Sequence, residues 1–399
     1  MVKAKSKSRF QMRHFYEKGF QALGLLSIGM ALLFLIFFLV SIVKDGYTAY
    51  IRHEIALPLY FDGDGFETEI AKALRSELGS STPDLSSHEI LGFLSHNAPQ
   101  EIKNEIVRDP LVHGKTRYLW LRASDEVDLY LKGKTSRLNE PQIKVLEILK
   151  EKENVRSVFN WQFIFGRDSR EPELAGIGGA FLGSLFVILI TLLTSFPLGV
   201  GSAIYLEEFA PKNRLLHWIE ININNLAAIP SIIFGLLGLV LFINIFHLPR
   251  PSALVGGLTL GLMTMPIIIV STRTALQTVP QNIRDAALGL GASHVQAVFH
   301  HVVPLALPGI LTGTILGIAR ALGETAPLLM VGMVAFIAEP PHSIWDPATT
   351  LPVQIFAWAR SAEPGFVENT SGAIMALLLL LGILNGGAII LRKRFEHHW

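Results

Sequence analysis

Long apolar segments alternate with polar stretches along this chain, and their lengths predict its organisation. A bilayer core is crossed by a helix of about 20 apolar residues. We expect six membrane-spanning helices, at Phe20–Val43, Gly178–Leu206, Ala228–Phe246, Ser252–Ser271, Pro308–Ala335 and Gly372–Leu391. The pattern therefore predicts an all-α polytopic membrane protein with six transmembrane helices.

Residues 44–170 follow a different pattern, that of a soluble domain. Apolar residues alternate along His53–Phe61, which predicts a strand, and recur at helical spacing along Gly65–Leu78. Arg117–Ala123 predicts a second strand and Pro141–Lys152 an amphipathic helix. We expect a small α+β domain inserted between the first and second membrane helices and lying outside the membrane.

Composition narrows the class of protein further. Half of the 399 residues are hydrophobic, the mean hydropathy is +0.42 and the net charge is +1. Such a balance is typical of a membrane protein and gives no case for nucleic-acid binding. The chain has no cysteine, which excludes disulfides and thiolate metal sites, and no metal-ligand pattern is recognisable. Two Gly-Lys-Thr sequences lack the upstream glycine of a phosphate-binding loop, so any ATP and Mg²⁺ must be bound by a partner and we expect no cofactor here.

Basic residues predict the orientation in the membrane. They gather before the first helix, after the second, around Arg273 and Arg284, and at the carboxyl end. With six crossings all four groups lie on one side, which the positive-inside rule assigns to the cytoplasm. We expect a bacterial inner-membrane protein with both termini cytoplasmic. Its parts are a basic tail (1–19), a first helix (20–43), a periplasmic α+β domain of unknown role (44–170), a core (171–391) with a cytoplasmic loop (280–308), and a basic tail (392–399).

Two charges inside the fifth apolar segment carry the sharpest chemical signal. Arg320 lies about 11 residues from the cytoplasmic end of that segment, or roughly 16 Å along a helix, near the bilayer middle. Glu324 follows four residues later, on the same helix face. One interpretation is a structural pair that neutralises itself. The other is a pathway lining in which Arg320 attracts an anion and Glu324 holds the guanidinium until the anion competes for it; phosphate suits the guanidinium fork.

Arg273, at the end of the fourth apolar segment, has two interpretations as well. It is either a positive-inside residue or a second anion contact near the inner mouth of a pathway.

The stretch after Arg273 predicts a compact knob on the cytoplasmic surface. It contains Asp285-Ala286-Ala287, then Gly291, then Pro304. We expect a helix, a turn of small residues and a second helix stopped by the proline, with room for another protein to pack closely.

The spacing of this knob resembles the coupling loop of importer-type ABC permeases. Asp285 stands where those proteins usually have glutamate, and Val303-Pro304 where Leu-Pro is usual. Across residues 170–391 the chain resembles the PstA-type permease subunits of bacterial phosphate ABC importers, which are binding-protein-dependent transport inner-membrane components. The matching phrases are PLGVGSAIYLEEFAPKN, NNLAAIPSIIFGLLGL, IRDAALGLGAS and ARALGETAPLL.

The resemblance implies a machine and a role. It implies the type I permease fold, without an ATPase site, and a pathway shared with a second, PstC-like permease subunit. It implies a PstB-like ATPase dimer on the knobs, a PstS-like periplasmic phosphate-binding protein, and inorganic phosphate as the cargo. By position, Arg273, Arg320 and Glu324 match charged residues that the family needs for transport. Residues 44–170 resemble an uncharacterised extension of some members.

Three other functions are compatible with these residues. One is a permease for another oxyanion, such as molybdate or sulfate. A second is a phosphate-sensing signalling scaffold that recruits a regulator through residues 44–170. The third, a passive anion channel, has no need of a docking knob.

Overall fold

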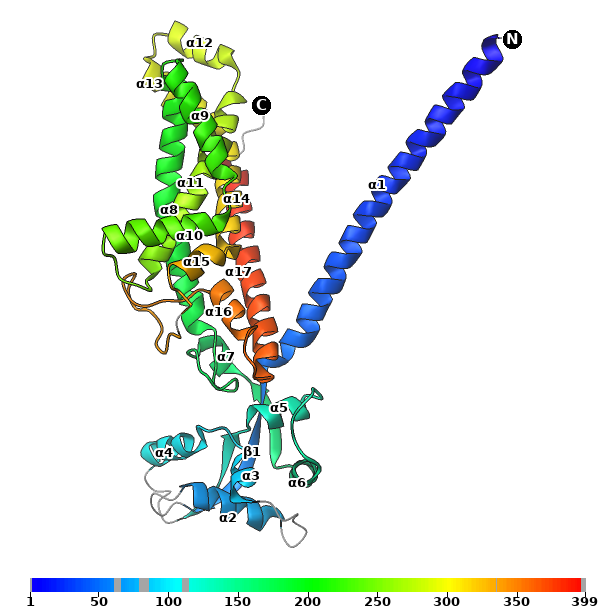
Figure 1. Ribbon diagram of the computed structural model, residues 1–399, viewed down its shortest axis with the longest axis vertical. Coiled ribbons are helices and arrows are strands. Elements are labelled where there is room, and N and C mark those ends of the chain that lie inside the picture. The colour runs from blue at the N-terminus through cyan, green and yellow to red at the C-terminus, as the bar shows by residue number, and fades with distance from the viewer. Residues whose placement is uncertain (1, 61–65, 79–85, 110–114, 335, 396–399) are drawn as a thin grey trace.

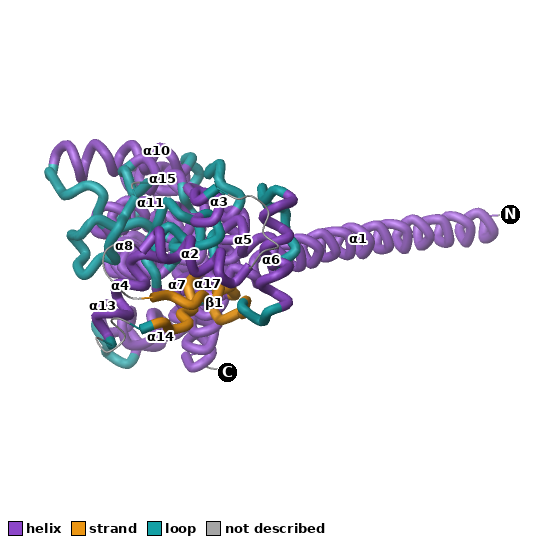
Figure 2. The backbone as a smooth tube through the Cα atoms, turned by 90° about the horizontal axis from the view of Figure 1, so that it is seen from below, coloured by secondary structure: helices purple, strands orange, loops and turns teal. Residues whose placement is uncertain are grey.

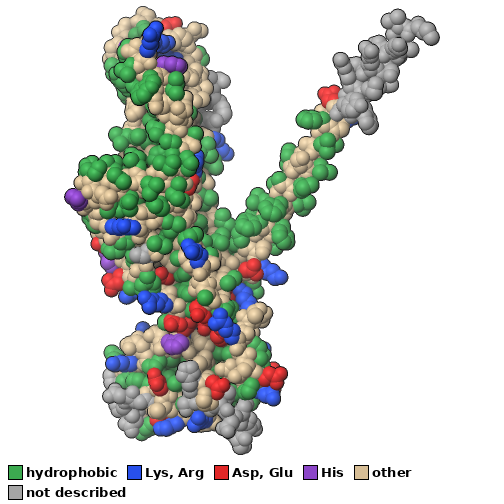
Figure 3. Space-filling model, viewed as in Figure 1, with side chains coloured by type: hydrophobic (Ala, Val, Ile, Leu, Met, Phe, Trp, Pro, Cys, Tyr) green, Lys and Arg blue, Asp and Glu red, His purple; other side chains and the backbone are tan. Residues whose placement is uncertain are grey.

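The chain folds into an elongated helical bundle with a small α+β unit at one end (Figure 1). The computed structural model describes residues 2–60, 66–78, 86–109, 115–334 and 336–395. In that part of the chain, five helices are long and apolar enough to span a membrane, and a bent pair of shorter helices makes a sixth span if it is counted as one. Hydrophobic side chains cover α1 and the bundle, while charges gather on the α+β unit (Figure 3).

The bundle contains helices and π-turns with the following bounds. They are α1 (Val2–Gly46), α8 (Gly178–Ile204) with the π-turn Tyr205–Phe209, α9 (Arg214–Ala227), α10 (Ser231–Gly238) with the π-turn Leu239–Ile245, α11 (Ala253–Gln277), α12 (Gln281–Gly289), α13 (His294–Ala297) with the π-turn Val298–Val302, α14 (Val303–Gly323), α15 (Ala326–Met330), α16 (Leu351–Trp358) and α17 (Gly365–Phe395).

Helix α11 is the centre of the bundle, because small residues let its neighbours approach its backbone. A Cβ added at Gly257 would lie 2.5 Å from the Cβ of Ile190 in α8. The Thr191 hydroxyl donates to the Gly257 carbonyl at 3.1 Å. On another side, a Cβ at Gly313 of α14 would collide with Ser271 of α11. Close contacts of this kind are how helices associate where apolar burial gives no advantage over lipid.

The third predicted span, Ala228–Phe246, is not a separate straight helix. Instead α9 and α10 meet at an angle of 103°, and α10 lies across the bundle (Figure 1). The break falls at Pro230, whose backbone is extended (ψ 135°). Proline has no N–H to continue a helix and disfavours helical geometry in the residue before it. The sequence did not reveal this bend, because the residues form an apolar run whether the helix is straight or bent.

The fifth predicted span, Pro308–Ala335, is wrong at both ends. The helix begins earlier, at α13, runs through the π-turn into α14 and ends at Gly323. Pro304 therefore does not stop a helix; it lies directly after the π-turn, inside the continuous run His294–Gly323. At the other end, the ring of Pro327 would collide with the Gly323 carbonyl, four residues earlier, if α14 continued.

Helix α1 stands apart from the other helices (Figure 2). It approaches α17 only near its own carboxyl end, where a Cβ added at Gly46 would lie 2.7 Å from the backbone of Ser371. The rest of its described side chains are largely exposed and apolar on all sides. A helix that is apolar all round is suited to a lipid environment.

The α+β unit is built on an antiparallel sheet of three strands in the order β2-β1-β3. Its elements are β1 (Ile51–Tyr60), β2 (Thr116–Arg122), β3 (Val155–Phe159), α2 (Phe66–Leu78), α3 (Ser87–Leu91), α4 (Ala98–Arg108), α5 (Asp125–Leu131), α6 (Glu140–Glu151) and α7 (Trp161–Phe165). The two predicted strands and two predicted helices are confirmed to within two residues, except that Phe61 and Gly65 lie outside the described residues. Ile55, Leu57, Leu74 and Phe93 are fully buried in its core.

The sidedness of the molecule follows from the arrangement of these parts. The start of α1, the knob of α12 and α13, and the end of α17 all point toward one end of the bundle, and the α+β unit lies at the other (Figure 1). The assignment of the knob end to the cytoplasm stays a prediction.

Candidate functional site

Arg320 and Glu324 lie at the end of α14, next to a break in the chain. Arg320 is in the last turn of the helix, where the carbonyl dipoles favour a cation. Glu324 is outside the helix, with φ −82° and ψ 118°. The prediction of an unbroken helix carrying both residues on one face is therefore wrong, although the two side chains still meet, with Arg320 Nε 3.5 Å from Glu324 Oε1.

The structure places Arg320 far along α14. It follows Val303, the start of α14, by 17 residues, or about 26 Å along the helix axis, and its depth in a membrane stays a prediction. Helix α15, which begins after Glu324 and Thr325, lies about midway along the bundle beside α10 (Figure 1). Helix α14 therefore ends about midway along the bundle, at the break after Gly323.

The guanidinium of Arg320 is on the open face of α14. Its side chain is 50% exposed, and Leu316, one turn earlier, is 65% exposed. The adjoining side of the helix packs on α11, where Gly317, three residues before Arg320, lies against Thr264. A half-exposed arginine surrounded by apolar residues is costly to place against lipid, so this face should border water or another subunit.

Arg273 is held by two carboxylates. Its Nη2 lies 2.7 Å from Glu220 Oε1 of α9, and its Nε donates to Glu207 at 3.2 Å. The side chain is 17% exposed. These pairs satisfy the guanidinium within the chain; its role as an anion contact stays a prediction.

The knob has the predicted order of a helix, a small-residue turn and a second helix. Helix α12 holds Asp285 and Ala286 on its exposed side and buries Ala287. Gly291 has φ +89°, which other residues rarely adopt, and so makes the tight turn possible. A capping box of Ser293 and Gln296 then starts α13.

The tip of the knob carries an apolar surface that the sequence reasoning missed. Four large side chains in and around α12 and α13 are exposed: Leu288, Leu290, Val295 and Phe299, with Leu290 91% exposed. The sequence could have predicted this surface, because large apolar residues are unusual in a short loop flanked by polar residues. An exposed apolar patch of this kind marks a protein contact.

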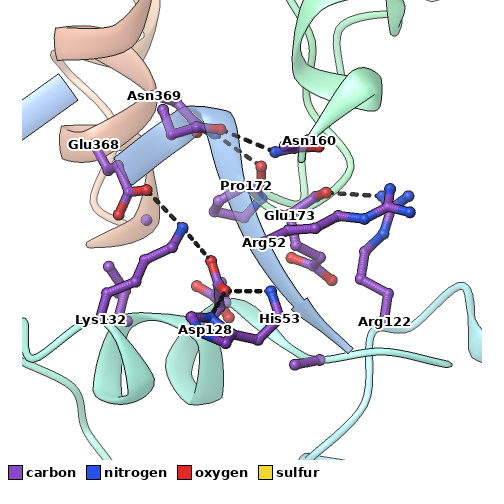
Figure 4. Close-up of a pocket in the computed structure, with 15 residues that line it drawn as sticks. Arg52, His53, Arg122, Asp128, Lys132, Asn160, Pro172, Glu173, Glu368 and Asn369 are labelled. Carbon is purple, nitrogen blue, oxygen red and sulfur yellow. Dashed lines mark hydrogen bonds and ion pairs between the residues drawn. The ribbon is translucent and has the colours of Figure 1, made fainter. Parts of the chain in front are cut away.

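A second cluster of charges joins the α+β unit to the last membrane helix (Figure 4). Glu368, in the first turn of α17, accepts from Lys132 at 2.7 Å and from Lys134 at 3.1 Å. Lys132 also pairs with Asp128, which lies 2.8 Å from His53 Nδ1. Burial favours a higher pKa for Asp128, but the bonds from His53 and Lys132 outweigh it and hold the pKa below its ordinary value.

The pocket enclosed by this cluster is small, about 30 Å³. Its lining combines three cationic with four acidic side chains, so it has no strong preference for an anion: Arg52, Arg122, Lys132, Asp125, Asp128, Glu173 and Glu368. The cluster therefore serves as a joint between the two parts of the chain.

One group of side chains in the described residues has ligand types suited to a metal. His96, Glu171 and Glu173 place their ligand atoms within 4.8 Å of one another. His96 is 82% exposed and Glu171 44% exposed. We assign no ion to this group.

Taken together, the apolar helices of the described residues are those of a polytopic membrane protein, and the exposed knob and half-exposed Arg320 are its candidate functional features. Comparison with protein families agrees. Residues 195–390 match the family described as binding-protein-dependent transport system inner membrane component. Residues 7–140, which include most of α1 and most of the α+β unit, match a domain of unknown function, DUF3333.

Relatives of known name match more than half of the chain. A probable ABC transporter permease, YqgI of Bacillus subtilis, is 33% identical over 59% of this chain and 79% of that protein. The phosphate transport system permease PstA of Haemophilus influenzae is 34% identical over 59% of this chain and 81% of that protein. PstA of Mycobacterium leprae is 31% identical over 58% of this chain and 75% of that protein.

The chain belongs to the binding-protein-dependent transport inner-membrane components, and it is a PstA-like ABC permease. Membership implies a multi-pass membrane protein that works in a complex with an ATPase and other subunits. Among solved structures, an inward-facing MetNI methionine ABC transporter matches with a TM-score of 0.44 at 18% identity, covering 54% of this chain and 95% of that chain. A likeness this loose adds nothing to the assignment.

Proposed function

We propose that this chain is the permease subunit of an ATP-driven importer of inorganic phosphate. In this proposal it forms half of the pathway with a second, PstC-like permease, and its knob docks on one member of a PstB-like ATPase pair. A PstS-like binding protein delivers the phosphate. The chain itself carries no ATP site and performs no catalysis.

The observation that carries the proposal is the half-exposed Arg320 at the end of α14. Its pairing with Glu324 is long, at 3.5 Å, so the guanidinium keeps donors available for another acceptor. A guanidinium can bind two oxygens of a phosphate at once. The names of the PstA relatives support phosphate over other oxyanions.

The second subunit is needed because the large hollow between the membrane helices, in the part of the chain that the structure describes, is not polar. A hollow of about 510 Å³ between α8, α14 and α17 is lined almost wholly by apolar side chains and does not suit an anion. Leu316 and Arg320 of α14 instead lie outside this hollow, with side chains 65% and 50% exposed. A partner that covers this face of α14 would complete a pathway around Arg320.

Uptake of labelled phosphate tests the proposal. In the assembled complex we expect Arg320→Gln to reduce uptake by about 100-fold, and Arg320→Lys to reduce it by about 10-fold, because lysine keeps the charge but loses the fork. Excess unlabelled phosphate should compete with the label, and sulfate and molybdate should not. Wild-type uptake by both variants, with equal amounts of subunit in the membrane, would contradict the proposed role of Arg320.

A further inference from the structure

Two consecutive glutamates at the end of α8 each hold an arginine from a different helix. Glu207 and Glu208 lie in the π-turn Tyr205–Phe209. Arg273 of α11 donates from Nε to Glu207 at 3.2 Å. Arg284 of α12 donates to Glu208 from Nη2 at 2.6 Å and from Nε at 3.2 Å. Paired bonds of this kind from arginine to a carboxylate fix both distance and direction.

Arg284 is anchored to the end of α11 as well. Its guanidinium donates to the carbonyl of Val279 at 2.7 Å and to that of Leu276 at 3.1 Å. The Leu276 carbonyl also accepts from the N–H of Val279 at 3.2 Å, so the arginine adds a charged donor to the turn that ends α11. Helix α13 joins the same point, since His294 Nε2 donates to the Glu208 carbonyl at 2.8 Å.

The base of the knob is thus fixed while its tip is open. The side chain of Glu208 is 5% exposed and that of Arg284 12%, whereas Leu290 at the tip is 91% exposed. In the described part of the chain, every side-chain hydrogen bond from α12 to a residue outside that helix is made by Arg284. A force on α12 therefore reaches α8 through this guanidinium, beside the apolar contacts of Ile283 and the bond of His294 to Glu208.

The neighbouring pair extends the connection to two further helices. Glu207 also accepts from Gln277 of α11 at 3.0 Å, and Glu220 of α9 accepts from Arg273 at 2.7 Å. Beyond this point α8 and α11 are in close contact, with Gly257 against Ile190, so they should move as one body. That body also contacts α14, whose last turn carries Arg320.

We propose that Glu208 and Arg284 are positioning residues that carry movement of α12 to α8, and that Glu207 and Arg273 carry it on to α11. The inference rests on the proposed function, because it needs an ATPase that moves the knob. Asp285 and the exposed tip make the contact with the ATPase, and the two glutamates turn that contact into movement of the helices around the pathway.

The test is the number of ATP molecules hydrolysed per phosphate transported, measured with the complete complex in lipid vesicles. We expect Glu208→Gln to keep the ATPase bound and its basal hydrolysis near the wild-type rate. Phosphate transport should fall by about 10-fold, a typical size for a coupling between sites. The exchanged pair Glu208→Arg with Arg284→Glu should recover part of the coupling, because it restores the ion pair but not the bonds to the carbonyls of Val279 and Leu276; a loss of fold alone does not predict this recovery.

Controls separate this inference from the proposed function. Glu339→Gln, in an exposed pair with Arg167, should leave the ratio unchanged. If Glu208→Gln does not assemble, Glu207→Gln serves instead, since Arg273 keeps Glu220, and it should raise the ATP-to-phosphate ratio as well. Unchanged coupling in both variants, or a loss of hydrolysis and transport in proportion to lost protein, would overturn the inference and leave the import function standing. A wild-type complex that binds no ATPase would overturn the proposed function itself.

Discussion

Asp125 shows how burial of single charges shapes the stability of this protein. It begins α5 and lines the pocket between the α+β unit and α17. Burial, and then repulsion from Glu173, raises the pKa of Asp125 from 3.8 to about 6, with smaller repulsions from Glu126 and Glu363. The folded protein therefore binds this proton more tightly than the unfolded chain does. The contribution of Asp125 to the free energy of unfolding falls as the pH rises from about 4 to about 6.

Replacing Asp125 with asparagine should remove this decrease in the free energy of unfolding at higher pH. We expect Asp125→Asn to raise the free energy of unfolding by about 1 kcal/mol at neutral pH, a figure reduced for partial solvent screening, and to have little effect near pH 4. Thermal unfolding of the purified full chain at several pH values measures the difference between variant and wild type. A variant that is less stable than wild type at neutral pH would show that the carboxylate is stabilising there.

Single-residue predictions from the sequence succeeded where partners are close along the chain. The ion pair of Arg320 and Glu324 was foreseen because four residues separate them, and even the end of the helix between them did not prevent their contact. The partners of Arg273 are 53 and 66 residues away, and the partner of Arg284 is 76 residues away. Only the fold brings such pairs together, so no spacing in the sequence could reveal them.

At the scale of elements, the same reasoning explains which helices were predicted well. The strands and helices of the α+β unit were predicted correctly because apolar residues alternate along a strand but recur at helical spacing along a helix. The broken segments were not found, since both halves of a bent span are as apolar as a straight one. Pro230 and Pro327 mark the two breaks, but proline also occurs inside α8 as Pro197 and inside α11 as Pro266 without ending either helix. Packing against neighbours decides between a kink and a break.

The joint between α5 and α17 gives a prediction at this scale. Lys132 and Glu368 are 6% and 5% exposed, and Glu368→Gln removes one of the two carboxylates that hold the buried Lys132 ammonium, the other being Asp128. A buried charge left with no partner costs about 3–5 kcal/mol, and the cost here is smaller because Asp128 keeps Lys132 paired. We expect the α+β unit of the variant to separate from α17 and to become more sensitive to limited proteolysis between residues 160 and 178, with hydrogen exchange increased in the first turn of α17.

A neighbouring pair is the matched control for that experiment. Glu363 and Arg137 also connect the end of the bundle to the α+β unit, but at 3.5 Å and with side chains 49% and 62% exposed. An exposed pair contributes about 0–1 kcal/mol, so the Glu363→Gln variant should be cleaved by the protease at the wild-type rate. Equal protection in both variants would show that the joint does not depend on Glu368.

At the scale of the whole molecule, the structure is a permease core with an additional unit fixed to its far end. The knob and the unit lie at opposite ends of the bundle (Figure 1), so a contact of the knob with an ATPase leaves the unit free to face the other side of the membrane. Between the two ends, α11 connects α8 and α14 through close glycine contacts. The sequence predicted this two-part organisation from its change of pattern at residue 44, whereas the rigid attachment through Glu368 depends on contacts across more than 200 residues.

The most direct measurement of the central claim uses the absence of cysteine from this chain. A single cysteine at Leu316, on the face that carries Arg320, is compared with one at Leu379 of α17, which is equally exposed, at 65%. With the assembled importer in membranes, a charged, water-soluble thiol reagent should label Leu316→Cys and not Leu379→Cys, and phosphate with its binding protein should slow the labelling. Leu316→Cys that resists the charged reagent but reacts with a lipid-soluble maleimide would place that face against lipid, and Arg320 could not then line a path for phosphate.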